Sequence, residues 1–250
     1  MRKLLAAAVL AVVAATGLSA CASDADPNVL KVGTEGTYAP FSYQDNGTLT
    51  GYDVEVARAI GEKLGKRVEF VQTPWDSIFA GLESQRFDLV ANQVTVNPER
   101  AAKYSLSQPY TTSEGVIVTK ADNTTITSLA DLAGKTTAQS STSNWSKVAA
   151  GAGAKVEAVE GFVQAVQLLK SGRVDATVND TLAVGEYTKK TGDTGIKIAA
   201  KTGETSKQAF AARKDDAALI ADIDKALEQL RADGTLTRLS EKYFGTDVSQ

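Results

Sequence analysis

Four polar segments each follow a stretch of sequence that predicts a β-strand. They combine a single arginine with acidic, hydroxyl, amide and aromatic side chains. An arginine binds a carboxylate through two parallel hydrogen bonds, and an aspartate accepts hydrogen bonds from an ammonium group. Arg100 and Asp180 therefore suit the zwitterionic head of a free α-amino acid. The segments are 34–41 (TEGTYAPF), 92–100 (NQVTVNPER), 139–145 (QSSTSNW) and 179–181 (NDT).

An internal repeat relates two of these segments. Residues 84–93 (SQRFDLVANQ) and 171–180 (SGRVDATVND) share a Ser-x-Arg-apolar-Asp pattern, then a strand-like run, then an asparagine and a polar residue. In open α/β sheets, ligands bind at the carboxyl ends of the strands. We expect the two strand ends to face one cleft from opposite sides. Chance similarity between two ordinary α/β units is the alternative.

Strands and helices alternate along the chain and must position these segments. Asp53 is expected to cap a helix that Gly65 ends, and the apolar spacing of 215–234 predicts a long helix that Gly234 ends. The alternation predicts a mostly parallel α/β architecture. The predicted strands are 29–33, 68–72, 87–91, 115–120, 155–159, 175–179, 196–200 and 209–213.

The N-terminal residues are typical of an export signal. Two cations precede an apolar run over residues 4–15, which is too short to span a bilayer. Residues 18–21 (LSAC) resemble the bacterial lipobox, in which the cysteine becomes a lipid-bearing N-terminus. We expect residues 1–20 to be a lipoprotein signal peptide, Cys21 to carry lipid, and 21–28 to be a tether. An ordinary cleavage site beside a chance cysteine is the alternative.

Composition excludes several classes of chemistry. The sequence has no histidine, which excludes imidazole catalysis and histidine-ligated metals. Cys21 is the single cysteine, so there is no internal disulfide. The net charge of −3 gives no reason to expect nucleic acid as a partner. We expect no cofactor and no metal.

Longer motifs connect the chain to a known family. The sequence resembles the family 3 periplasmic-type solute-binding proteins, which are the polar amino-acid receptors of ABC importers. Within that family, NQVT followed by ER, together with AQSSTSNW and the glutamate of GTEGTY, is most similar to the cystine-binding branch. The motifs that carry the family resemblance are VGTEGTYAPFSY, LTGYDVEVARAIGEKLG, WDSIFAGLESQRFDLVANQVT, LSQPY and DGTLTRLSEKYFG.

The resemblance implies the type II periplasmic-binding-protein fold, an α/β fold of two lobes joined by two hinge strands. The lobes close around the ligand like a Venus flytrap. Lobe 1 is expected to comprise residues 29–112 and 205–250, and lobe 2 residues 113–204. The protein is expected to be a monomer without enzymatic activity.

The resemblance also implies roles for individual residues. Arg100 would bind the ligand α-carboxylate, helped by Thr95 and by backbone groups near Gln93. Thr142 and Ser143 would open a lobe 2 helix whose amides face the same carboxylate, and Asp180 would take the α-ammonium. The family often has glycine where this chain has Ser141, a departure that concerns the backbone of this loop and not the start of the helix. The remaining members of the expected site are Tyr38 and Trp75 beside the ligand side chain, Glu35 near its distal group, and Asn92, Ser140 and Asn144.

Each assignment has an alternative that needs no ligand. Arg100 fits a surface cation in the turn NPER, and Asp180 fits the cap of the helix that follows, alone or together with a binding role. Trp75 fits a core residue and Tyr38 a loop anchor. The other turn-forming candidates are Glu35, Asn92 and Asn144.

The expected function is that of an extracytoplasmic receptor, anchored by lipid to the cell membrane, that passes an amino acid to the permease subunits of an ABC importer. L-cystine is the favoured ligand, and a basic amino acid is the second candidate because Glu35 would suit a cationic tail. A dehydratase on the same fold, using Glu35 or Asp180 as acid or base, is the enzymatic alternative. A sensory module would need a membrane-spanning segment in the same chain, and no such run follows residue 21.

Overall fold

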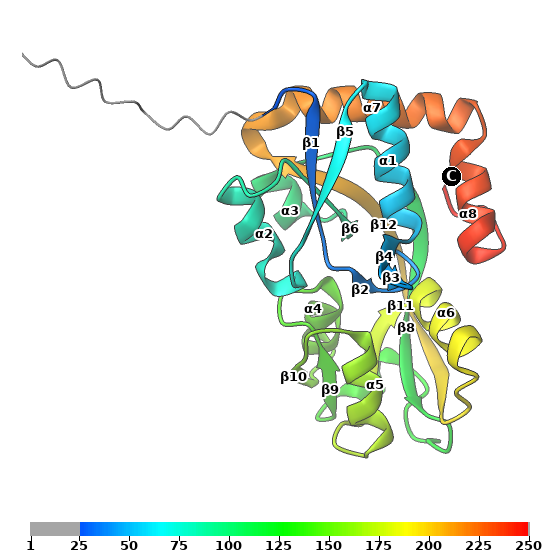
Figure 1. Ribbon diagram of the computed structural model, residues 1–250. Helices are drawn as coiled ribbons and strands as arrows, with labels where there is room; N and C mark the ends of the chain where they lie inside the picture. The colour runs from blue at the N-terminus through cyan, green and yellow to red at the C-terminus, as the bar shows by residue number, and fades with distance from the viewer. Residues whose placement is uncertain (1–25, 250) are drawn as a thin grey trace, which may run out of the picture.

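The computed structural model describes residues 26–249 and shows two lobes, one above the other (Figure 1). Residues 1–25 and 250 lie outside the described residues, and so do the predicted signal peptide, Cys21 and most of the predicted tether. The described chain starts at Asp26, whose backbone and side-chain oxygens accept hydrogen bonds from the amides of Val29 and Asn28. Within residues 26–249, no helix is long and apolar enough to cross a membrane.

A seven-stranded sheet runs through both lobes of the described chain, in the order β11-β8-β12-β6-β1-β5, with β7 beside β12. β1 pairs in parallel with β5 and β6, whereas β12 is antiparallel to β6, β7 and β8, and β11 is antiparallel to β8. The expectation of a mostly parallel architecture is therefore wrong, because the strands that connect the lobes run back along their neighbours. The strands are β1 (Val29–Thr34), β5 (Arg67–Gln72), β6 (Leu89–Thr95), β7 (Tyr104–Leu106), β8 (Thr111–Lys120), β11 (Thr177–Asp180) and β12 (Ile196–Arg213).

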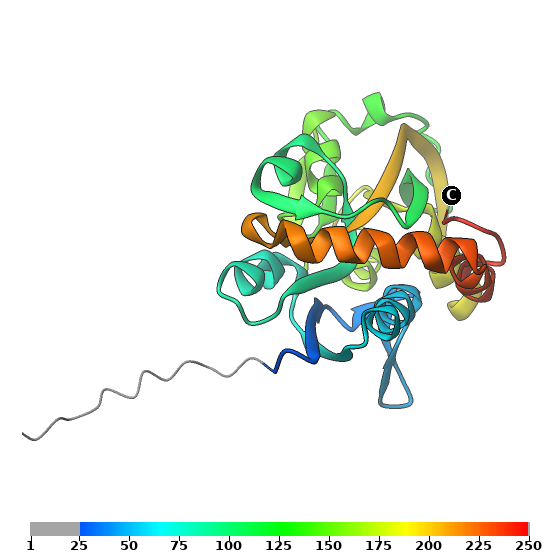
Figure 2. The same cartoon turned by 90° about the horizontal axis from the view of Figure 1, so that it is seen from above.

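Lobe 1 has a hydrophobic core on each face of its sheet. Because side chains alternate along a strand, Leu89 and Ala91 of β6 join the core under α1, α7 and α8, while Val90 and Val94 join the core under α2. Viewed from above, α7 lies across lobe 1 (Figure 2). The elements are β2 (Thr37–Tyr38), β3 (Ser42–Asp45), β4 (Thr48–Thr50), α1 (Tyr52–Leu64), α2 (Trp75–Glu83), α3 (Pro98–Lys103), α7 (Ala217–Ala232) and α8 (Thr235–Phe244).

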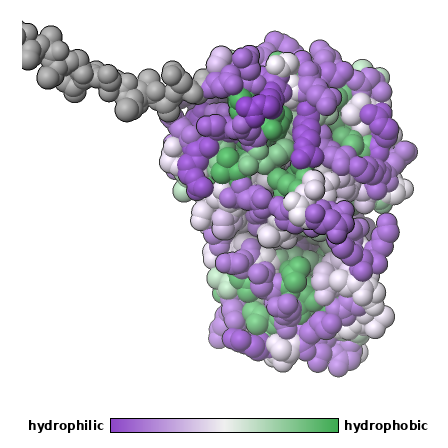
Figure 3. All heavy atoms as spheres, in the orientation of Figure 1, coloured by the Kyte–Doolittle hydropathy of each residue, from purple (hydrophilic) through white to green (hydrophobic). Residues whose placement is uncertain are grey.

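Lobe 2 repeats this arrangement on a smaller scale. Val116 and Val118 of β8 pack in a core with α5, and Ile117 points to the other face, into a core with Trp145 of α4. β9 pairs in parallel with β10, and β9 is not among the predicted strands. Most of the visible surface is hydrophilic, with hydrophobic patches on each lobe (Figure 3). The elements are β9 (Thr136–Gln139), α4 (Asn144–Gly151), β10 (Lys155–Ala158), α5 (Phe162–Lys170) and α6 (Thr181–Thr191), with short 3₁₀ turns at Leu129–Leu132 and Lys214–Asp216.

Two strands, β8 and β12, cross between the lobes (Figure 1). The prediction of separate strands at 196–200 and 209–213 is wrong, because β12 is continuous over 18 residues. The polar residues between the two predicted strands suggest a loop, but several of them, such as Ser206 opposite Ser113, pair with β8. Irregular register within β12 bends this ladder. The lobe boundaries at 112/113 and 204/205 lie in the crossing and stay a prediction.

Gly115 on β8 makes room for a lobe 2 side chain against both crossing strands. A Cβ atom at Gly115 would lie 2.5 Å from the ring of Trp145 and 2.6 Å from the hydroxyl of Thr202 on β12. Both distances are well below a van der Waals contact, so Trp145 packs where only a glycine fits. The indole of Trp145 thus rests on the hinge.

We predict that Gly115→Ala lowers the free energy of unfolding by about 1–3 kcal/mol, because the added methyl group overpacks the site of Trp145. Gly185→Ala on α6 is the matched control, since a Cβ there has no neighbouring atom within 4 Å. Gly185→Ala should be neutral or stabilising by up to about 1 kcal/mol. Urea denaturation measures both, and equal stability of the two variants would contradict the packing argument.

Candidate ligand-binding site

A pocket lies between the lobes, near the ends of β1, β6 and β11. Its empty volume is about 590 Å³, a figure that includes open solvent at the mouth. Both halves of the internal repeat meet here, since Asn92 and Asn179 line it. Lobe 1 contributes Glu35, Thr37, Tyr38, Trp75, Asn92 and Gln93. Lobe 2 contributes Ala138, Gln139, Ser140, Ser143, Asn144, Trp145, Gly161, Phe162, Ala165, Thr177, Val178 and Asn179.

The structure places most, but not all, of the predicted site residues in this lining. Glu35, Tyr38, Trp75, Asn92, Gln93, Ser140, Ser143 and Asn144 line the pocket, whereas Thr95, Arg100, Thr142 and Asp180 do not. Gln139 and Asn179 line it and are absent from the predicted set. The repeat could have identified Asn179, because it matches Asn92. Gln139 ends β9, a strand that segment 139–145 was expected to follow but that is missing from the list of predicted strands.

Arg100 is a buried cation without a carboxylate partner among the described residues. The Asn97 side chain caps α3 by accepting from the Arg100 amide, which places Arg100 in the first turns of a short helix. Its guanidinium lies 5.2 Å from the centre of the Trp75 ring and donates to the Thr95 carbonyl at 2.9 Å. Arg100 is only 8% exposed, and burial lowers its pKa to about 10. An anion that reached this guanidinium would relieve its desolvation.

Glu35 and Asn92 form a fixed pair in the lobe 1 wall. The Asn92 amide donates to the Glu35 carboxylate at 2.5 Å, and its carbonyl accepts from the Glu35 amide at 2.8 Å and from the Thr34 hydroxyl at 3.1 Å. Burial raises the pKa of Glu35 to about 7, against the lowering effect of the Asn92 hydrogen bond. The carboxyl is therefore poised to ionise when a cationic group approaches.

Asp53 supports the pocket from behind and does not cap α1. The helix begins one residue earlier, at Tyr52 after Gly51, so the predicted cap is wrong. The Asp53 carboxylate instead accepts from the Gln93 amide at 2.7 Å and from the Gln93 side chain at 2.6 Å. Gln93 has a φ of 50°, a left-handed conformation that these two hydrogen bonds hold in place. Burial raises the pKa of Asp53 to about 7.

Asp180 caps α6, which is one of the roles that the sequence suggests for it. Its carboxylate accepts from the Leu182 amide at 2.8 Å and from the Ser113 hydroxyl on β8. Burial raises the pKa of Asp180 to about 6. The neighbouring Asn179 accepts from the Tyr38 hydroxyl at 2.9 Å, which joins the two lobes inside the pocket. Asp180 therefore connects the hinge, α6 and the pocket wall.

Three buried polar atoms of the lining have no hydrogen-bond partner among the described residues. They are the indole N–H of Trp75, the side-chain carbonyl of Gln93 and the side-chain amide nitrogen of Gln139. Each residue is less than 9% exposed. Buried polar groups are normally paired, and these three atoms belong to residues that line the pocket. In residues 26–249, no group of three acidic, cysteine or histidine residues could hold a metal ion.

Comparison with known proteins agrees with this geometry. Residues 30–246 match the model of the bacterial extracellular solute-binding proteins, family 3. The L-cystine-binding protein TcyA of Bacillus subtilis (strain 168) is 54% identical over 224 residues, which cover 89% of this chain and 83% of TcyA.

Of two solved structures, the one more similar to this protein in shape is less similar to it in sequence. An ancestral arginine-binding protein bound to arginine is 40% identical, with a TM-score of 0.82 over 87% of this chain and 99% of that one. The L-cystine solute receptor of Neisseria gonorrhoeae, unliganded and open, is 46% identical, with a TM-score of 0.61 over 89% and 95%. The higher TM-score is with the ligand-bound structure, so the lobes of this protein are arranged more like those of that structure than like those of the open one. The family model matches residues 30–246, almost the whole described length, and the pocket lies between the two lobes. The chain therefore belongs to the family 3 bacterial extracellular solute-binding proteins.

Proposed function

We propose that this protein is an extracytoplasmic receptor that delivers L-cystine to the permease of an ABC importer. The observation that carries the proposal is Arg100, a buried cation that lies against Trp75 of the pocket wall and has no carboxylate partner among the described residues. A buried charge is unfavourable unless a counter-charge reaches it, and the carboxylate of an amino acid supplies one. The similarity to TcyA supports cystine among the amino acids.

One amino-acid head of cystine would lie between the lobes. Arg100 would bind its carboxylate with Thr95, and the loop before α4, which holds Thr142 and Ser143, would approach the same group from lobe 2. Asp180 does not line the pocket but directly follows the lining residue Asn179, and it would accept from the ammonium of the bound ligand. A cation near Asp180 would also favour its ionised form, whose burial is otherwise unfavourable.

The second head would use groups that a single amino-acid head leaves unpaired. The sulfur bridge would lie between Tyr38 and Trp75, where sulfur-to-ring contacts contribute about 0.3–1.5 kcal/mol each. Glu35 would accept from the second ammonium. The donors for the second carboxylate would be the Trp75 indole N–H and the Gln139 side chain, both without a described protein partner, with Asn92, Asn144 and Ser140 nearby.

A basic amino acid is the second candidate ligand. Glu35 beside two aromatic rings would suit a guanidinium or ammonium tail, and the arrangement of the lobes is similar to that of the arginine-bound protein. A cationic tail has no acceptors, however, and would leave the N–H groups of Trp75 and Gln139 unpaired. A second carboxylate would satisfy both, so the orphaned donors favour cystine.

Capture and delivery complete the proposed role. The receptor would work as a monomer, anchored to the cell membrane by lipid on Cys21 after removal of the signal peptide. Closing of the lobes would present the loaded form to the permease subunits. A dehydratase on this fold would need Glu35 or Asp180 as acid or base, but Asn92 and the α6 amides already engage these carboxyls. Intact cystine after prolonged incubation would separate the receptor from an enzyme.

We predict that L-cystine at about a hundredfold above its dissociation constant stabilises the protein by roughly 2.7 kcal/mol, visible as a rise in melting temperature. An excess of a thiol reductant should remove the shift, because reduction halves the ligand and the protein has a single cysteine and no disulfide of its own. A larger shift with L-arginine than with L-cystine, or a shift that survives reductant, would overturn the choice of cystine.

Replacing Arg100 should show whether it binds the carboxylate. We expect Arg100→Lys to weaken binding at least a hundredfold with little change in melting temperature, because lysine keeps the charge and loses the planar fork. Lys103→Gln, which removes an exposed cation from the same short helix, should bind like the wild type. Calorimetric titration measures both, and wild-type affinity in Arg100→Lys refutes the assignment.

Cystine affinity should rise with pH and level off above about pH 7. In the ligand-free protein the pKa of Glu35 is about 7 and that of Asp180 about 6, so both carboxyls bind protons below these values. An ammonium binds the ionised carboxyl and lowers its pKa, so binding releases protons, and each group weakens affinity by up to about tenfold per pH unit below its pKa. Titration between pH 5.5 and 7.5 measures the slope. Glu35→Gln should flatten it near pH 7, and a wild-type affinity independent of pH would contradict the proposal.

A further inference from the structure

Asp76 makes a concentrated contact between the lobes. It is the second residue of α2 and follows Trp75, which lines the pocket. One carboxylate oxygen accepts from the Thr142 amide at 2.9 Å and from the Thr142 hydroxyl at 2.8 Å. The other oxygen accepts from the Ser141 amide at 3.2 Å. All three donors belong to lobe 2, so one side chain of lobe 1 holds the loop that precedes α4.

The local chemistry explains why an acid fits this place. The amides at and before the first turn of a helix have no partner within the helix, and the positive end of the helix dipole favours a negative charge. Ser143 caps α4 by accepting from the Ser146 amide at 3.1 Å. The amides of Ser141 and Thr142 lie further out, and the Asp76 carboxylate satisfies both.

The loop before α4 divides its residues between two tasks. Ser140 and Ser143 line the pocket, whereas Ser141 and Thr142 face Asp76. The Thr142 amide and hydroxyl, which were expected to face the ligand, therefore already donate hydrogen bonds to Asp76. The contact lies beside the pocket residues Trp75 and Ser143, so it forms at the rim that the lobes close.

We propose that Asp76 is a closure residue, which clasps the 140–143 loop to α2 and thereby retains the bound solute. This proposal rests on the proposed function for its role in retention. Because the three hydrogen bonds join different lobes, opening breaks them together. A ligand held only in the closed form binds with an apparent affinity that falls with the closed fraction.

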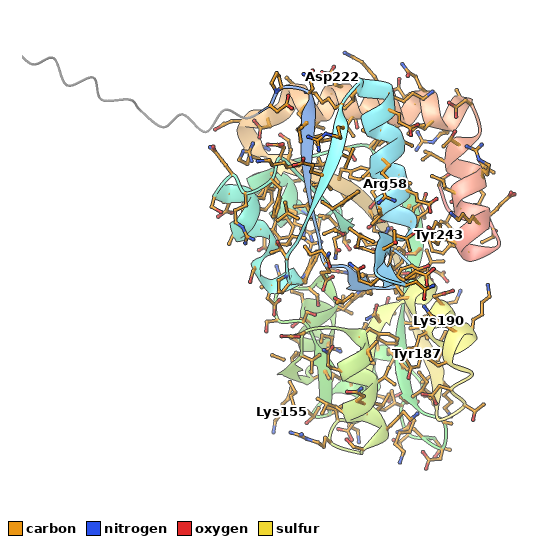
Figure 4. The ribbon with its side chains drawn as sticks, in the orientation of Figure 1. Arg58, Lys155, Tyr187, Lys190, Asp222 and Tyr243 are labelled. Atoms are coloured by element: carbon orange, nitrogen blue, oxygen red, sulfur yellow. The ribbon has the colours of Figure 1, made fainter. Side chains whose placement is uncertain are left out.

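Other polar side-chain contacts across the junction in residues 26–249, such as the Tyr38–Asn179 hydrogen bond inside the pocket, are single interactions. Lys147 of α4 pairs with Glu99 of α3, but both side chains are 56% exposed, and exposed ion pairs contribute little. On the α6 side, which Figure 4 shows with Lys190 labelled near the junction, the Lys190 ammonium lies 4.9 Å from the centre of the Tyr43 ring. Asp76 and its partners Ser141 and Thr142 are exposed too, so the contact differs from the others in its three hydrogen bonds to one carboxylate and not in burial. Glu99 supplies a matched control.

The test compares Asp76→Ala with Glu99→Gln, using L-cystine as the probe and stopped-flow tryptophan fluorescence as the readout. Trp75 and Trp145 are the two tryptophans of the sequence, and both line the pocket from opposite lobes. Asp76→Ala should raise the dissociation rate at least tenfold and change the association rate less than threefold. Glu99→Gln should change neither rate by more than about twofold. The melting temperature of the ligand-free protein should stay unchanged in both.

Thr142→Val removes the hydroxyl contact and keeps both amides, so it should raise the dissociation rate less than Asp76→Ala. The double variant should dissociate no faster than Asp76→Ala alone, because the two residues act through one contact. Equal dissociation rates in Asp76→Ala and Glu99→Gln overturn the clasp.

If the wild type binds neither L-cystine nor L-arginine, the proposed function fails and the clasp is judged without ligand. Small-angle scattering should then show a larger radius of gyration for ligand-free Asp76→Ala than for the wild type and Glu99→Gln. Identical radii would refute the clasp independently of the ligand.

Discussion

The pocket depends on two strands that cross between the lobes. Within the described chain, β8 and β12 are the strands that hold lobe 1 and lobe 2 in one sheet, so the bend of this ladder affects how the two walls of the pocket face each other. Side chains at or next to the pocket also contact the two crossing strands, β8 and β12. Trp145 packs against Gly115 and Thr202, and Asp180 accepts from Ser113. The wall of the site and the joint that moves it are therefore parts of the same packing arrangement.

The second organising feature is an imbalance of buried charge. Three carboxyl groups at or behind the pocket, those of Glu35, Asp53 and Asp180, have pKa values raised by burial, and the cation Arg100 has its pKa lowered by the same cause. Each carboxyl accepts hydrogen bonds from neutral groups: Glu35 from Asn92, Asp180 from Leu182 and Asp53 from Gln93. Arg100 donates to the Thr95 carbonyl, and none of the four has an ion-pair partner among the described residues. The unfavourable desolvation of charged groups is thus concentrated near the pocket. The opposite charges of a zwitterionic ligand would offset it, which favours binding to the ligand-free protein.

The sequence was most informative where local signals and the fold agree. The helix over 215–234 and the meeting of the two repeat ends at the pocket followed from apolar spacing and from polar residues near the ends of strands. The strand predicted at 87–91 extends further than expected, because β6 continues through Asn92 to Thr95. It failed where tertiary contacts decide. Asp53 had the chemistry of a cap, but its carboxylate is used 40 residues away by Gln93. The polar middle of β12 had no strand pattern, because pairing with β8 and not burial forms it. Gln139 and Asp76 matter through groups on other elements, which no local pattern encodes.

The path of the chain has a consequence for how the protein matures. Lobe 1 joins the two ends of the described sequence, since α7 and α8 share a core with β1 and α1, whereas β9, β10 and β11 of lobe 2 follow one another closely. Contacts between distant segments close large loops and form more slowly than local ones. A chain that emerges from its N-terminus has all of lobe 2 available before α7 exists. Until then Tyr52 and Ile60 are not covered by the side chains of α7 and α8. An incomplete chain would therefore expose the hydrophobic face of α1 to chaperones and proteases, while lobe 2 could already fold.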